Sequence, residues 1–225
     1  MNRNHEPSGT VLGPQFVKNP WPAPNSDRIK AITTDGPGLA DLWEASPILR
    51  DDPEPQTAAI VEALFPGNPL LCCGWRRHQF DTRPRTNWHK LHELQFIVSS
   101  PMTARQGMTQ EGKLSAHTLE NTGPRRFLVV EFDTAAIDDQ AALLLHLAEF
   151  APMALALHSG GKSLHGWFYC ADCPDEILGD FMRSAAELGA DTATFNRSQF
   201  VRMPDGKRES GQRQTVFFFN PEVVE

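Results

Sequence analysis

Two carboxylic acids, Glu131 and Asp133, stand at the end of a stretch of β-branched and aromatic residues that begins at Arg126. Such residues favour a β-strand, and because side chains alternate between the faces of a strand, the two acids should share one face. Carboxylates held side by side can bind hard divalent cations, as phosphoryl-transfer chemistry requires. An ordinary solvated strand end has the same pattern, so the pair predicts a metal site only together with other groups.

A helix and a second strand are expected to follow these acids. Asp138 can cap a helix whose leucines recur at helical spacing as far as Phe150, and Pro152 ends it. Residues 153–157 then form an apolar run typical of a buried strand. Two strands joined by one helix in so short a stretch predict a crossover unit in which both strands join the same sheet.

A turn with two glycines, residues 159–163, comes directly after that second strand. Its glycines allow the backbone to approach a phosphate closely, while Lys162, Ser163 and His165 supply hydrogen-bond donors. The turn also resembles the end of a Walker A loop. However, that motif needs a glycine where Ala156 stands, and it needs a helix next instead of the apolar strand expected here. A P-loop NTPase is therefore not expected.

The order of these motifs is similar to that of the archaeo-eukaryotic primase superfamily, and within it to primase-polymerases and plasmid RepB-prime-type primases. The similarity covers about residues 126–220, and Ser163-Leu164-His165 with the glycines before it is the most specific part. The first motif of the family usually begins with Asp, whereas this chain has Glu131, which can ligate a metal from a longer arm.

The third acid of the family is expected after the next helix, which should cover residues 174–188. Asp191 matches best, because in RepB-prime-type primases a Gly-x-Asp segment precedes an Arg-x-Pro-Gly turn, and Arg202 begins the corresponding turn here. Asp205 is the alternative, although Pro-Asp-Gly is also an ordinary turn sequence.

The resemblance implies an α/β (α+β) fold. Its catalytic core would be RRM-like, with a mixed sheet and flanking helices over residues 126–225. An N-terminal helix and strand subdomain over 28–125 would precede it, after an extended, proline-rich lead-in over 1–27. The implied activity is that of a DNA-dependent primase or polymerase, which transfers nucleotides from NTPs or dNTPs on a single-stranded DNA template. A plasmid, phage or mobile element is the implied replicon, with a helicase as partner in trans or in a missing C-terminal portion.

The resemblance also assigns roles to individual residues and implies two Mg²⁺ or Mn²⁺ ions. The metal ligands would be Glu131, Asp133 and Asp191, which together with His165 make up the catalytic set. The incoming nucleotide would be held by Ser159, Gly160, Gly161, Lys162, Ser163, His165 and Arg202.

A basic segment, residues 76–90, interrupts a chain whose net charge is −7. Its cations are Arg76, Arg77, Arg83, Arg85 and Lys90, and aromatic rings and histidines are interleaved with them. Cations next to rings that can stack on bases suit single-stranded nucleic acid, while a solvated basic loop fits the pattern equally well. The overall acidity argues against a protein that coats nucleic acid electrostatically.

The four cysteines of the chain are Cys72, Cys73, Cys170 and Cys173. The second pair has zinc-ligand spacing, but the first pair is adjacent, which is awkward for two ligands of one ion. We therefore expect no zinc site, and no disulfide if the protein is cytosolic.

The composition, with 40% hydrophobic and 22% charged residues, is that of an ordinary globular protein. No apolar run approaches the roughly 20 residues of a membrane span, and the N-terminus lacks the core of a signal peptide. We therefore expect a cytoplasmic protein without a membrane partner. Two other functions fit the same residues. One is a non-catalytic module that binds single-stranded nucleic acid in replication, and the other is a metal-dependent phosphohydrolase or nuclease.

Overall fold

The computed structural model describes residues 21–224. Most of the predicted lead-in, residues 1–20, therefore lies outside the described residues. The lead-in was predicted to extend to residue 27, but helix α1 (Ser26–Thr33) already begins at Ser26. Asn25 caps this helix, because its side-chain oxygen accepts a hydrogen bond from the backbone N–H of Arg28.

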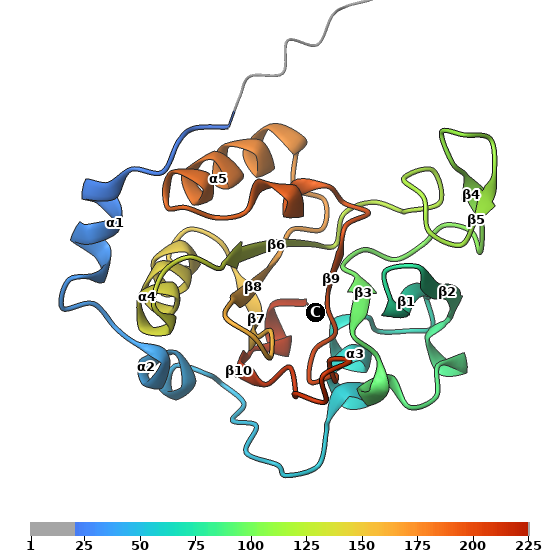
Figure 1. Ribbon diagram of the computed structural model, residues 1–225, viewed down its shortest axis with the longest axis horizontal. Helices are drawn as coiled ribbons and strands as arrows, with labels where there is room; N and C mark the ends of the chain where they lie inside the picture. The colour runs from blue at the N-terminus through green and yellow to red at the C-terminus, as the bar shows by residue number, and fades with distance from the viewer. Residues whose placement is uncertain (1–20, 225) are drawn as a thin grey trace, which may run out of the picture.

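Two four-stranded antiparallel sheets form the centre of the molecule (Figure 1). The first has the order β2-β1-β3-β9 and consists of β1 (Leu70–Arg76), β2 (Gln79–Pro84), β3 (Phe96–Val98) and β9 (Phe200–Arg202). The second has the order β10-β7-β8-β6 and consists of β6 (Phe127–Phe132), β7 (Met153–His158), β8 (Leu164–Tyr169) and β10 (Val216–Phe219). A small hairpin of β4 (Gly107–Met108) and β5 (Leu114–Ser115) stands apart from both sheets.

The second sheet contains the predicted strand–helix–strand unit, formed by β6, α4 (Ile137–Ala148) and β7. Strand β8 pairs antiparallel with both β6 and β7, so it lies between two strands that run in the same direction. With α5 (Asp175–Glu187) after β8, the succession follows an RRM-like core as far as its second helix, whereas the next strand, β9, joins the first sheet. The α+β fold class is confirmed. The expectation of a mixed sheet was wrong, because β8 separates the parallel strands β6 and β7, and β10 pairs antiparallel with β7.

Both faces of the second sheet are buried, which explains why its strands are apolar almost throughout. On one face Leu128, Val130 and Phe132 belong to the same hydrophobic cluster as residues of α4 and α5. On the other face Phe127 and Val129 join a cluster that includes α3 (Thr57–Leu64), β1 and β3. Because β9 pairs with β3, segments from both sides of residue 126 share one sheet, and the predicted division into subdomains stays a prediction.

The remaining helices lie around this core. Helix α2 (Leu39–Glu44) packs with α1 against α4, at the opposite end of the molecule from the first sheet (Figure 1). The 3₁₀ helices are η1 (Arg85–Asn87), η2 (Leu91–Glu93), η3 (Thr192–Phe195) and η4 (Pro221–Val224). Among residues 21–224 no helix has the length and apolar character needed to cross a membrane.

Two local predictions about α4 were wrong. Asp138 does not cap this helix, which begins after Ala136; its carboxylate instead accepts a 2.9 Å hydrogen bond from the backbone N–H of Leu39 and so caps α2. Phe150 was expected on the buried side, but the helix ends at Ala148 and the Phe150 side chain is 68% exposed. The first difference arises because Asp138 contacts a helix that is distant in sequence, and the second because α4 ends two residues before Phe150.

Candidate functional site

A pocket of about 320 Å³ lies where β6 ends, and we call it the acid pocket. It is lined by Glu131 and Asp133 from β6 and its end, by Ser159, Gly161, Lys162 and Ser163 from the turn between β7 and β8, and by Arg202 and Arg208. Arg202 is the last residue of β9, which belongs to the first sheet, and Arg208 follows in the next loop. Four separate chain segments, drawn from both sheets, therefore meet at this point.

Glu131 is the most constrained acid of the pocket. It pairs across the sheet with His165, whose Nε2 lies 3.3 Å from Glu131 Oε1, and the same oxygen accepts a 3.0 Å hydrogen bond from Ser163 Oγ. Burial by itself raises the pKa of this carboxyl. Hydrogen bonds and charge from His165, together with Ser163 and the positive charge of Arg202, outweigh burial and lower the pKa to about 2. Glu131 is therefore a carboxylate at neutral pH.

Asp133 completes the acid pair and is more open to solvent. Its Oδ2 lies 3.1 Å from Lys162 Nζ, and the two side chains are 39% and 73% exposed, respectively. An ion pair that is this exposed contributes little to stability. Lys162 can therefore leave Asp133 at little cost when another anion or a cation enters the pocket.

The two glycines of the turn make room for Arg208. Gly160 has φ +71°, a left-handed conformation that favours glycine, and a Cβ on it would press against the side chain of Arg208. At Gly161 the position of a Cβ is already filled by Arg208 Nη1. Arg208 also donates a 3.3 Å hydrogen bond to the carbonyl oxygen of Ser159, so its guanidinium lies across the whole turn. No motif in the sequence pointed to Arg208.

Arg202, which was predicted from sequence, lines the acid pocket with Arg208. Its Nη1 donates to Gln95 Oε1 at 3.3 Å, and its guanidinium lies 4.9 Å from the ring centroid of Phe96. Burial lowers the pKa of Arg202, the positive charges of Arg208 and Arg77 lower it further, and Glu131 opposes them. The mutual repulsion of these guanidinium groups leaves the pocket ready to accept an anion.

His165 lies behind Glu131 and not at the surface of the pocket. Its side chain is almost fully buried, and it is absent from the lining of the acid pocket. Within the described part of the chain, its Nδ1 is buried without a hydrogen-bond partner. The geometry makes His165 a support of Glu131, while its predicted contact with a nucleotide stays a prediction.

The two candidates for the third acid differ sharply in their surroundings. The backbone N–H of Asp191 donates a 2.9 Å hydrogen bond to the carbonyl oxygen of Glu131, but its carboxylate caps η3 by accepting from the N–H of Ala193. Asp205 is 3% exposed, and its Oδ2 lies 3.0 Å from Arg213 Nη2. Asp205 is thus occupied by a structural ion pair. Among residues 21–224 there is no group of three His, Cys, Asp or Glu side chains placed to hold a metal ion.

The basic segment does not form one free cationic surface. Four of its five cations pair with carboxylates, as Arg76–Glu209, Arg83–Asp81, Arg85–Glu62 and Lys90–Glu93. Three of these carboxylates come from outside the segment, so local charge counting could not include them. Arg77 has no ion pair within the described residues, and its positive charge contributes to the lowered pKa of Arg202. The predicted role of this segment in binding nucleic acid stays a prediction.

The cysteines are free thiols in different surroundings. Cys72 and Cys73 belong to different hydrophobic clusters, as expected for neighbours on opposite faces of β1. Burial raises the pKa of the Cys72 thiol, and that of Cys170, to about 12. These thiols are protonated at neutral pH and fill the core.

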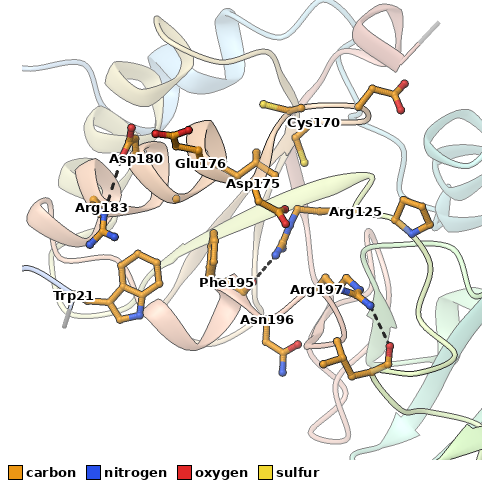
Figure 2. A pocket seen from close by; sticks show the side chains of 16 residues that line it. Trp21, Arg125, Cys170, Asp175, Glu176, Asp180, Arg183, Phe195, Asn196 and Arg197 are labelled. Carbon is orange, nitrogen blue, oxygen red and sulfur yellow. Dashed lines mark hydrogen bonds and ion pairs between the residues drawn. The ribbon is translucent and has the colours of Figure 1, made fainter. Parts of the chain in front are cut away.

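A second pocket, of about 1090 Å³, lies between α5 and η3 and shares no lining residue with the acid pocket (Figure 2). Its arginines already have internal partners. Arg125 donates a 2.6 Å hydrogen bond to the carbonyl oxygen of Phe195 and lies over that ring, and Arg183 lies near Asp180. Trp21 packs edge-on against Phe195. The cavity combines these arginines with the acids of α5 and has no equivalent of the acid pair beside the glycine turn.

Comparison with known proteins adds one likeness. No protein-family model matches the chain, and no curated protein sequence matches it. Among solved structures, the chain is similar to the AEP domain of the primase-polymerase (PrimPol) of cyanophage S-2L. The two are 15% identical with a TM-score of 0.44, and the match covers 75% of this chain and 94% of that chain.

Proposed function

We propose that this protein is a template-directed nucleotidyltransferase of the primase-polymerase kind, which joins NTPs or dNTPs on a single-stranded DNA template. One observation carries the proposal: the acid pocket combines an ionised carboxylate and a second acid with a glycine turn and two arginines. Carboxylates suit a divalent cation, and the turn and arginines suit a triphosphate. Nucleotidyl transfer needs both in one place.

The acid pair fits a hard divalent cation. Glu131 and Asp133 offer oxygen ligands, and in residues 21–224 no hydrogen bond or ion pair engages Oε2 of Glu131 or Oδ1 of Asp133. Mg²⁺ or Mn²⁺ bound there would supply Lewis-acid activation of a 3′-hydroxyl and neutralise charge on the phosphates. Asp191 is proposed as the third ligand, since its backbone is bonded to that of Glu131. Its carboxylate would have to leave the N–H of Ala193.

The other residues of the pocket act on the nucleotide or on Glu131. Lys162 would move from Asp133 to the phosphates, while Arg202 and Arg208 neutralise the charge that develops when the 3′-oxygen bonds to the α-phosphorus and pyrophosphate leaves. Ser163 and His165 would keep the Glu131 carboxylate ionised and oriented. A plasmid, phage or mobile element as the replicon, and a helicase as partner, stay predictions of the motif resemblance.

A gel assay of labelled-nucleotide incorporation on single-stranded DNA tests the proposal. Reactions with and without a primer, with NTPs or dNTPs and with Mg²⁺ or Mn²⁺, would compare the wild type with the double variant Glu131→Ala, Asp133→Ala. The matched control is Glu44→Ala, Glu111→Ala, which removes two exposed acids and changes the net charge equally. We expect products from the wild type and the control and none from the acid-pocket variant.

The same assay separates the two alternative functions. Retained binding of single strands with no product under any condition would favour the non-catalytic replication module. Degradation of labelled DNA with Mg²⁺ and without free nucleotides would favour a nuclease that uses the same acids. Either result would refute the polymerase proposal.

A further inference from the structure

A second hollow, of about 340 Å³, adjoins the acid pocket. It lies between the β1–β2 hairpin and the loop that carries Arg208, and we call it the hairpin hollow. Arg208 lines both the acid pocket and the hairpin hollow. Gln95 connects them as well, because its Nε2 donates to the carbonyl oxygen of Trp75 at 2.8 Å and its Oε1 accepts from Arg202. The two hollows are therefore neighbours that share Arg208.

The hairpin hollow has a wall that can stack on a planar ring. The side chain of Trp75 lines it and is 37% exposed, although tryptophan is usually buried. Behind Trp75 stands the buried Trp88, at 5.9 Å between ring centroids, and the Nε1 of Trp88 donates to the carbonyl oxygen of Leu71. This backing holds the exposed indole in place, so little side-chain entropy is lost when a ligand stacks on it.

The opposite wall of the hairpin hollow is formed by the loop that carries Arg208, and this loop is tied to the β1–β2 hairpin. An ion pair between Arg76 and Glu209 joins the end of β1 to the loop that carries Arg208. This pair neutralises itself, which leaves Lys207 and Arg208 against Glu93 as the other charged groups of the lining. The lining of the hollow has the same net charge as that of the acid pocket, so the exposed indole of Trp75, and not a lower charge, makes this hollow suitable for a planar group that follows a phosphate.

We propose that the hairpin hollow takes the base and sugar of the nucleotide whose phosphates lie in the acid pocket, with Trp75 stacking on the base. The inference rests on the proposed function, since it assumes that a nucleotide triphosphate occupies the acid pocket. Arg208, shared by both hollows, would contact the phosphate nearest the sugar. Together the two hollows reach the size range of small-molecule sites.

Calorimetric titration tests this inference without requiring catalysis. The ligands are ATP, dATP and inorganic tripolyphosphate, each with Mg²⁺, so that binding of phosphates alone is separated from binding of the base. We expect Trp75→Ala to weaken nucleotide binding about tenfold or more, as for loss of one stacking ring, with tripolyphosphate affinity unchanged. Trp75→Phe should retain most of the affinity, and Gln79→Trp, which fills the hollow from an exposed position, should act like Trp75→Ala.

Two arginine variants test whether Arg208 binds the phosphates. Arg208→Ala should weaken both the nucleotides and tripolyphosphate, while Arg105→Ala, an exposed control for the lost charge, should weaken neither. Nucleotide affinity that is unchanged in both Trp75→Ala and Gln79→Trp would overturn the hairpin hollow as a base site and leave the proposed function intact. Wild-type protein that binds neither nucleotide nor tripolyphosphate would overturn both.

Discussion

Replacement of Glu131 by Gln should remove a pH-dependent part of the stability of this protein. The pKa of Glu131 falls from 4.5 to about 2 in the folded state, because the contacts with His165, Ser163 and Arg202 outweigh the cost of burial. At about 1.4 kcal/mol per unit, such a shift corresponds to about 3 kcal/mol of stability at neutral pH. Only 25% of the Glu131 side chain is exposed, so solvent screens this contribution only partly.

The sign follows from the direction of the shift. A carboxyl whose pKa is lowered by folding stabilises the native state above its unfolded pKa, near 4.5, and the stabilisation is lost as the pH falls toward 2. About 2 kcal/mol of the difference between the wild type and Glu131→Gln should therefore disappear between pH 5 and pH 3.

Urea unfolding, followed by circular dichroism at a series of pH values, measures this difference. Glu44→Gln provides the control, because it removes one exposed carboxylate and changes the net charge by the same amount. Subtraction of the control removes the general effect of protonating other acids. A difference between the wild type and Glu131→Gln that does not vary from pH 7 to pH 3 would refute the assignment of Glu131 as the stabilised carboxylate.

Three further substitutions test the surroundings of the site. Gly161→Ala should fold normally but displace the guanidinium of Arg208, so that tripolyphosphate affinity falls several-fold in calorimetry while the melting temperature is unchanged; equal affinity would mean that Arg208 does not bind phosphate. Asp205→Asn should lower the free energy of unfolding by about 2 kcal/mol in urea titrations, because the charge-assisted hydrogen bonds from the partly exposed Arg213 are lost, without changing nucleotide affinity. Asp191→Asn can still cap η3 and should leave stability unchanged, yet reduce incorporation roughly tenfold to a hundredfold; an unchanged rate would remove Asp191 from the proposed ligands.

Much of the second sheet and half of the acid pocket could be predicted from local sequence. The alternation of side chains placed Leu128 and Val130 in the core, and it placed Glu131 and Asp133 at one pocket. The apolar run after Pro152 predicted β7, and the glycine turn was correctly expected before a strand instead of a helix. These features depend on periodicity within a few residues, which a single sequence displays directly.

Other parts of the site depend on contacts between distant segments. Charge counting within residues 76–90 could not find the acids that neutralise most of that segment, since Glu62 and Glu209 come from elsewhere in the chain. Asp205 was the alternative to Asp191, and only the fold shows that its buried carboxylate pairs with the partly exposed Arg213. The local pattern favoured Asp191, but it could not show that the carboxylate of Asp205 has an arginine partner.

The sequence by itself determined the elements and the chemical groups: a strand that ends in two acids, a crossover helix, and a glycine turn with donors. The tertiary structure alone decided that β8 lies between β6 and β7, which places His165 opposite Glu131. It also decided that β9 joins the other sheet and delivers Arg202 and Arg208 to the acids. The physical reason is that strand order and loop placement follow from burying both faces of the second sheet at once, and that condition involves the whole chain.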